Sequence, residues 1–266
     1  QIQVKMSKNI LVVIPLHEFN ENVEQMLKNA VNSVPSEYDV HISTTNSVYE
    51  EYGEHILNLF SDRNLSIYYN SENENSDFCT LVNNSLDKDS EWFSILEYDD
   101  TFNANWFSNV ETYIDYKPDV SVFLPLTELI DYSNGNFIGY GNEAPWASSF
   151  SDEIGVIDNE CIQQYFDFYM TGGVYNTKDF KDVGGLKPSI KLTFWYEFLL
   201  RITNNNKKVY VIPKLGYNHL LNRENSLYDY YQKNISEEEG KFWLDLARQD
   251  YFYKTERSKD KYTFEQ

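Results

Sequence analysis

The hydrophobic pattern of the first hundred residues predicts strands alternating with helices. Residues 9–15 form a continuous β-branched run, which is typical of a strand buried on both faces in a parallel sheet. Apolar residues then recur at helical spacing from Val23 to Val34, behind Asn20 or Asn22 as the N-cap. Two more helices are expected over residues 47–60 and 78–86, and three more strands over 38–42, over 65–69 and in the run that ends at Glu97. This βαβαβαβ order predicts an α/β fold with a mostly parallel sheet and right-handed crossovers.

The second half of the chain is less regular, and its elements are predicted one by one. The patterns predict helices over residues 105–116 and 190–203, strands over 120–124, 167–176 and 208–213, a hairpin turn at 133–135 and a polar loop over 141–160. A closing helix begins behind a capping box at Ser236. We therefore expect one domain over residues 6–226 and a helical extension over 227–266. Residues 1–5 precede Met6 and are left out of the predicted domain.

Three carboxylates follow directly after the fourth predicted strand: Glu97, Asp99 and Asp100. Crowded carboxylates repel one another and raise one another's pKa unless a cation or several hydrogen-bond donors lie among them. Mg²⁺ and Mn²⁺ prefer such oxygen ligands. In sheets of this kind, ligands bind beyond the carboxyl ends of the strands, where residues 15–18 and 43–47 are also expected. By itself the acidic stretch is equally compatible with a metal site and with a solvated turn.

Composition and charge narrow the function classes. The formal net charge of −20 argues against a protein that binds nucleic acid or an anionic membrane unaided. Cys79 and Cys161 are far apart and form no CxxC pair, which argues against a zinc site and against a disulfide framework. The apolar run over residues 10–16 is too short to cross a membrane. These observations predict a soluble, cytoplasmic protein without an integral membrane segment.

Two other enzyme classes fit the acidic stretch poorly. Glu97-x-Asp99-x-Thr101 imitates the DxDxT motif of phosphatases that use an aspartyl nucleophile, but those enzymes need Asp at the first position, after the first strand. A sugar nucleotidyltransferase would need a glycine-rich basic loop after the first strand, and residues 16–19 (Leu-His-Glu-Phe) lack both features.

The order of several short motifs resembles family 2 glycosyltransferases of the GT-A fold. The resemblance covers roughly residues 8–226, and no single motif is specific without the others. The motifs are Val12-Val-Ile-Pro15, Asn83, Leu96-Glu-Tyr-Asp-Asp100, Val183-Gly-Gly-Leu186, Tyr196-Glu-Phe-Leu-Leu-Arg201 and His219-x3-Arg223-x2-Ser226. The resemblance implies inverting transfer of a sugar from a nucleotide diphosphate sugar, commonly with Mn²⁺ or Mg²⁺ as cofactor.

The resemblance also implies roles for individual residues. Glu97-x-Asp99 matches the family's DxD-type motif, so that Asp99 would ligate the metal and Glu97 would face the ribose or the water shell of the metal. His219 matches a C-terminal histidine that can reach the metal or the diphosphate. The residues that would line the nucleotide sugar are Pro15, Leu16, His17, Glu18, Thr44, Asn83, Glu97, Tyr98, Asp100 and Gly173.

The chain departs from the family where the catalytic base is expected. The acidic Glu-Asp pair one turn before Arg201 is Phe194-Trp195, and Glu197 is the nearest carboxylate that could serve as base. Glu197 and Arg201 are also spaced as an ordinary i,i+4 pair, and that interpretation is as well supported as catalysis. Trp146 and Trp195 could stack on an acceptor sugar or belong to the core. The expected uracil-binding Asp after the second strand is missing as well, which leaves the base specificity open.

The function predicted from the sequence is a metal-dependent inverting glycosyltransferase. It would move a hexose from UDP-glucose or UDP-galactose to a hydroxyl acceptor such as a glycan, with Glu197 as base. The alternative is a catalytically inactive nucleotide-sugar or carbohydrate-binding protein on the same fold, which the missing Glu-Asp pair favours. A purely structural use of the fold is the third possibility. The oligomeric state is left open.

Overall fold

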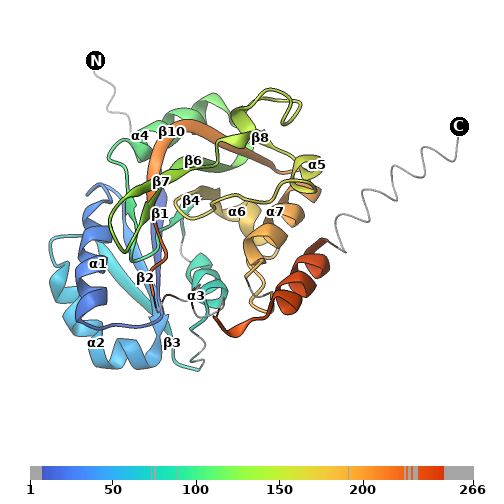
Figure 1. Ribbon diagram of the computed structural model, residues 1–266. Coiled ribbons are helices and arrows are strands. Elements are labelled where there is room, and N and C mark those ends of the chain that lie inside the picture. Colours follow the sequence, from blue (N-terminus) through green and yellow to red (C-terminus); the bar gives the residue numbers. More distant parts are fainter. Residues whose placement is uncertain are drawn as a thin grey trace, which may run out of the picture.

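A ten-stranded mixed sheet with helices on both faces forms the centre of the protein (Figure 1). The computed structural model describes residues 8–248 except 73, 75, 88, 191, 225, 227, 228 and 230–232. The strands are β1 (Ile10–Leu16), β2 (Val40–Thr45), β3 (Leu65–Asn70), β4 (Trp92–Ile95), β5 (Thr101–Phe102), β6 (Val120–Asp131), β7 (Phe137–Gly141), β8 (Val156–Ile157), β9 (Val174–Asn176) and β10 (Lys208–Leu221). The helices are α1 (Glu21–Asn32), α2 (Asn46–Leu59), α3 (Phe78–Asn84), α4 (Trp106–Tyr116), α5 (Asn159–Ile162), α6 (Thr177–Asp182) and α7 (Phe194–Asn204), with short 3-10 turns η1 (Ser85–Asp87) and η2 (Ala144–Trp146).

The first four strands are parallel and adjacent in the order β3-β2-β1-β4, as their sequence pattern predicts. The three helices between these strands each begin at a capping side chain. Each of the side chains of Asn20, Thr45 and Asp77 accepts a hydrogen bond from the backbone N–H three residues further along the chain. Asn20 is therefore the N-cap of α1. This half of the protein brings the ends of β1 and β4 together at one edge of the sheet.

Alternate residues of β1 enter two separate hydrophobic clusters. Val12 and Ile14 pack with α1, α2 and α4 on one face, whereas Leu11 and Val13 pack with α3, α6 and α7 on the other (Figure 1). Burial on both faces explains why β1 reads as a continuous apolar run rather than an alternating one.

The second half of the sheet contains an antiparallel strand that is shorter than the sequence pattern predicts. The strand predicted over residues 167–176 is confined to β9, which pairs antiparallel with β4 and β6. The backbone cannot extend the strand further back, because Gly172 lies at φ +80°. Helix α7 likewise begins at Phe194 rather than near residue 190, since Leu192 takes a left-handed φ of +57°. The hairpin around residues 133–135 is confirmed, with β7 paired to β6.

Strand β10 is long and irregular. It pairs parallel with β6 but has register shifts between Val211 and Leu215 and between Leu215 and Tyr217. Gly216 lies within this stretch, where an added Cβ would be 2.5 Å from the indole of Trp106. Beyond the irregularity, β10 continues as a regular strand to Leu221.

A helix over residues 237–248 follows, shown in red in Figure 1. Its first turn is capped by Ser236, whose Oγ accepts from the N–H of Glu239 at 3.1 Å. Ala247 is buried in the cluster that contains α7. The rest of the predicted extension, residues 249–266, lies outside the described residues, as does Met6. Among the described helices, none has the length and apolarity needed to cross a membrane.

Candidate metal and nucleotide site

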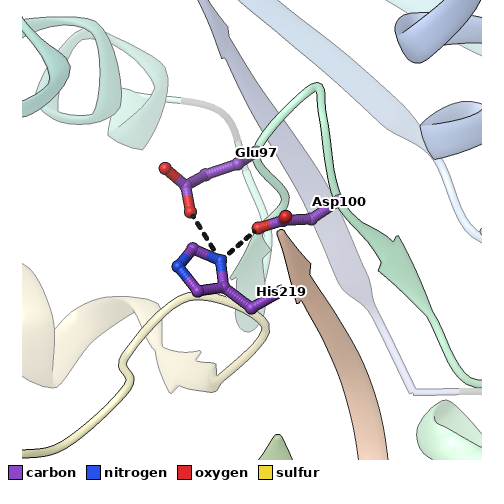
Figure 2. A group of neighbouring side chains, drawn as sticks. All are labelled: Glu97, Asp100 and His219. Atoms are coloured by element: carbon purple, nitrogen blue, oxygen red, sulfur yellow. Dashed lines mark hydrogen bonds and ion pairs between the residues drawn. The ribbon is translucent and has the colours of Figure 1, made fainter. Parts of the chain in front are cut away.

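Glu97, Asp100 and His219 converge at the carboxyl end of β4 (Figure 2). Glu97 and Asp100 lie in the turn after β4, and His219 projects toward them from β10. The His219 Nδ1 is 2.7 Å from Asp100 Oδ2 and 3.4 Å from Glu97 Oε2. One potential ligand atom from each of the three residues lies within 4.8 Å of the other two. The strand-end acids and His219 are therefore neighbours.

Asp100 is the buried anchor of this group. Its Oδ2 accepts from the Tyr217 hydroxyl at 2.8 Å and from His219 Nδ1, and its Oδ1 accepts from the backbone N–H of Leu220 at 2.8 Å. The Tyr217 hydroxyl in turn accepts from the N–H of Glu97 at 3.1 Å. The Asp100 side chain is fully buried. One carboxylate therefore joins the turn after β4 to β10 and fixes the orientation of the His219 ring.

The crowding of charges shifts the pKa values of the group. Burial opposes protonation of His219, but Asp100, Glu97 and Asp99 outweigh that effect and raise its pKa to about 10. Burial and the neighbouring Asp100 raise the pKa of Glu97 well above its usual value. Without a cation, the group holds protons that a bound metal would have to displace.

The donor set fits a divalent cation such as Mn²⁺. Two carboxylates and one imidazole are oxygen and nitrogen ligands that this ion accepts. The His219 Nδ1 is the ring nitrogen that faces both carboxylates, so a cation shared by the three residues would bind that atom in place of its hydrogen bond to Asp100. Glu97 is about one-third exposed, so the group is open to solvent on its side. Glu97, Asp100 and His219 are the residues that would hold the metal.

Asp99 lies outside this group, in contrast to the sequence prediction that it ligates the metal. Its Oδ2 accepts from Arg223 Nε at 2.8 Å. Arg223 also donates to the Tyr98 hydroxyl, which donates to Glu18 Oε1, both at 3.0 Å. Burial and Asp100 raise the pKa of Asp99 to about 6, with Arg223 opposing them. The physical reason for the difference is the ion pair, which turns Asp99 toward Arg223.

Of the residues predicted to line the nucleotide, His17, Glu18 and Tyr98 lie together. The rings of His17 and Tyr98 are 5.6 Å apart, and Tyr98 bonds to Glu18 as described. Pro15 and Leu16 are buried at the end of β1, so they contribute to the packing that supports the strand end.

Thr44, Asn83 and Gly173 make internal contacts instead. Thr44 donates to the Leu16 carbonyl at 2.6 Å and is buried. The Asn83 amide bonds both the N–H and the carbonyl of Leu186. The Gly173 carbonyl accepts from Ser94 at 2.8 Å. The hydrogen-bonding groups of Thr44 and Asn83 are thus used to join elements of the fold.

Glu197 has the geometry of a structural ion pair. Both of its oxygens accept from Arg201, at 2.8 Å from Nε and 2.8 Å from Nη2, and Lys187 Nζ lies 3.4 Å away. Glu197 is 1% exposed. Arg201 also donates to the carbonyls of Val183 and Gly185. A base must reach the acceptor hydroxyl with a free oxygen, and Glu197 presents none. The catalytic role inferred for Glu197 stays a prediction, which this pairing with Arg201 does not favour.

The two tryptophans predicted to contact the acceptor lie in separate places. Trp195 stacks against Tyr175 at 5.9 Å between ring centres and packs against the cluster that contains α7. Trp146 is 38% exposed, but its Nε1 donates to the carbonyl of Val211 on β10, eight residues before His219. The structure brings neither tryptophan into contact with the strand-end acids.

Two further residues of the site were absent from the predicted set. Tyr217 lies two positions before His219 on the same strand, so strand periodicity alone could have placed both on one face. Tyr169 lies 5.7 Å from the His219 ring, in the segment between α5 and β9 that the sequence pattern misassigns. The spacing of Tyr217 and His219 was present in the sequence, whereas the contact between Tyr169 and His219 required the tertiary fold.

No family model and no curated protein matches this chain. Among solved structures, TarS 1–349 of S. aureus in complex with UDP-GlcNAc is 18% identical, with a TM-score of 0.65 over 91% of this chain and 65% of that one. The mannosyltransferase PcManGT from Pyrobaculum calidifontis, with GDP-Man and Mn²⁺, is 10% identical, with a TM-score of 0.61 over 83% of this chain and 59% of that one. GalNAc-T7 with UDP, GalNAc and Mn²⁺ is 14% identical, with a TM-score of 0.57 over 83% of this chain and 45% of that one.

The chain spans less than two-thirds of the length of each of these three structures. Likeness at such low identity concerns the fold. The predicted fold is confirmed: the protein has the GT-A fold.

Proposed function

We propose that this protein binds a nucleotide diphosphate sugar together with a divalent cation and transfers the sugar to a hydroxyl acceptor. The observation that carries the proposal is the convergence of Glu97, Asp100 and His219 at the carboxyl ends of the parallel strands. The three similar structures are complexes with UDP-GlcNAc, with GDP-Man and Mn²⁺, and with UDP, GalNAc and Mn²⁺, which supports the same ligand classes for this chain. The predicted donors are UDP-glucose and UDP-galactose, with inversion at the anomeric carbon.

Some residues of the site would bind the metal, and others would bind the nucleotide. Asp100 holds the His219 ring in place, and Glu97 supplies a second carboxylate on the open side. A bound Mn²⁺ or Mg²⁺ would stabilise the negative charge that develops on the departing diphosphate. His17, Glu18 and Tyr98 lie beside this group, where the nucleotide is expected.

The alternative is binding without transfer. Glu197 is engaged by Arg201, and Phe194 and Trp195 occupy the positions of the family's acidic pair. General-base catalysis contributes typically about 10²–10⁴-fold, so a protein without a base could retain binding and lose turnover. This observation favours a nucleotide-sugar-binding protein as the second candidate function.

Donor binding and turnover are separable by experiment. We expect UDP-glucose or UDP-galactose to bind in calorimetry with Mn²⁺ present, and His219→Gln to weaken that binding. UDP release in the presence of a glycan acceptor would establish transfer, and binding without release would establish the alternative. UDP-GlcNAc and GDP-mannose serve as comparison donors. A protein that binds none of the four would contradict both functions.

Mn²⁺ binding is expected to tighten as the pH rises from 6 to 8. His219, with a pKa of about 10, is protonated over this range, and Glu97 also holds its proton more tightly than usual. A cation must displace these protons, so its affinity should increase by up to about tenfold per pH unit for each proton released. Calorimetry in buffers of different ionisation enthalpy measures how many protons are released when Mn²⁺ binds.

The matched control for this pH dependence is His55→Gln. His55 also pairs with a carboxylate, that of Glu24 at 2.7 Å, but lies on α2 and is outside the group. This variant should keep the wild-type slope, whereas His219→Gln should flatten it. An affinity independent of pH in the wild type would argue against His219 as a ligand.

A further inference from the structure

Arg223 is paired with the one strand-end carboxylate that lies outside the candidate metal group. Besides its bond to Asp99, its guanidinium lies 5.3 Å from the centre of the Tyr98 ring and donates to the Tyr98 hydroxyl. The Arg223 and Asp99 side chains are 10% and 12% exposed. Arg223 is therefore held within the site rather than extended into solvent.

The position of Arg223 links the two halves of the proposed donor site. It follows His219 by four residues, just after the end of β10, and through Tyr98 it is connected to Glu18 on the loop after β1. Within the described part of the chain, no other Arg or Lys forms an ion pair with Glu97, Asp99 or Asp100. Besides the protonated ring of His219, Arg223 is thus the positive charge that an incoming polyanion would meet here.

We propose that Arg223 couples nucleotide binding to metal binding: the diphosphate takes the guanidinium from Asp99, and Asp99 then becomes available to the cation. This inference rests on the donor site of the proposed function. It assigns two states to Asp99, neutralised by Arg223 in the ligand-free protein and free to ligate in the complex.

Charge and geometry support the exchange. A guanidinium binds phosphate oxygens through two parallel hydrogen bonds, and a diphosphate carries more negative charge than one carboxylate. Asp99 is the immediate neighbour of Asp100, so its release adds an oxygen ligand beside the group that Asp100 anchors. Because coupling between two ligands is reciprocal, the cation must strengthen nucleotide binding by the same factor.

The test measures the affinity for Mn²⁺ alone and with saturating UDP. Asp99→Asn should leave the affinity for Mn²⁺ alone near the wild-type value, because Arg223 already occupies that carboxylate. With UDP present, the same substitution should weaken Mn²⁺ binding by about tenfold, within the range of about 5- to 150-fold that couplings between sites usually span. A large loss for Mn²⁺ alone would overturn the proposal, as would no loss with UDP.

Arg223→Met tests the other partner. It should tighten binding of Mn²⁺ alone about fivefold or more, since Asp99 is then free. The gain should disappear in the double variant Asp99→Asn, Arg223→Met. A gain that persists in the double variant would show that Asp99 is not its source and would overturn the proposal, as would no gain in the single variant.

Two further variants complete the design. Arg248→Met removes a guanidinium that also lies over a tyrosine ring, 5.7 Å from Tyr196, and should leave Mn²⁺ binding unchanged. Arg223→Lys keeps the charge and should keep the wild-type affinity for Mn²⁺ alone. If the wild type binds UDP but UDP changes Mn²⁺ affinity by the same factor in Asp99→Asn as in the wild type, the inference fails and the proposed function stands. If the wild type binds neither UDP nor any of the four nucleotide sugars, the proposed function fails as well.

Discussion

Glu197→Gln is expected to lower the free energy of unfolding by about 3–5 kcal/mol, the usual cost of removing one partner of a buried ion pair. The substitution keeps the size of the side chain but leaves the Arg201 guanidinium, 6% exposed, without its countercharge. Arg201 would retain only uncharged acceptors, the carbonyls of Val183 and Gly185 and the amide oxygen of the new side chain, and would remain charged, since arginine does not lose its proton in proteins. Urea unfolding followed by circular dichroism measures the loss.

Asp182→Asn is the matched control for this prediction. Asp182 forms an i,i+4 pair with Lys178 on α6, with the same spacing as Glu197 and Arg201 but at the surface. The urea midpoint of this variant should stay at the wild-type value, because exposed pairs contribute little. If Glu197→Gln instead unfolded at the wild-type urea concentration while sugar transfer was lost, Glu197 would be the catalytic base after all.

Asp100→Ala is expected to disrupt both the fold and the metal site. The Tyr217 hydroxyl, the His219 Nδ1 and the Leu220 N–H would lose their common acceptor in a buried position, at an expected cost of about 3–5 kcal/mol. Without that acceptor the His219 ring is no longer oriented, and Mn²⁺ affinity should fall by at least the 10- to 100-fold typical of lost supporting contacts. Urea unfolding and Mn²⁺ calorimetry on the same sample measure the two effects.

Asp99→Asn provides the comparison on the same turn. Because burial raises the pKa of Asp99 in the folded protein to about 6, above an unfolded value of about 3.9, the stability it contributes is present below pH 4 and is lost as the pH rises through 6. An uncharged side chain avoids that loss at pH 7. It also leaves the Arg223 guanidinium, 10% exposed, without its countercharge, so this variant should be destabilised, but by less than Asp100→Ala, which removes the common acceptor of three donors. Equal destabilisation by the two substitutions would contradict the anchoring role of Asp100.

The parallel half of the fold was predictable because its signals are local. Continuous apolar runs, helical spacing and the capping residues before α1, α2 and α3 all occur within short windows of sequence. Strand β9 was harder to predict, since only three of its residues are extended and its partners β4 and β6 lie about 80 and 50 positions away in the chain. The strand-end rule placed Glu97 and Asp100 at one edge, the family resemblance added His219, and the structure brings the three together.

The finer assignments depended on contacts between distant residues. Asp99 and Asp100 are adjacent in the sequence, yet one faces Arg223 and the other faces Tyr217 and His219. Nothing in their spacing distinguishes them, because the turn geometry and the partners on β10 decide which way each points. Glu197 was assigned by elimination as the nearest acid to the expected base position, and its burial against Arg201 appears only in three dimensions.

The irregular stretch of β10 constrains the number of residues in this segment rather than their identity. Between two matched pairs, Val211 with Leu124 and Tyr217 with Thr127, β10 advances six residues while β6 advances three. Side chains alternate between faces along a strand, so losing or gaining a single residue here would turn Tyr217 and His219 to the opposite face. Insertions and deletions in this segment should thus be selected against in related chains, even where many single substitutions are accepted.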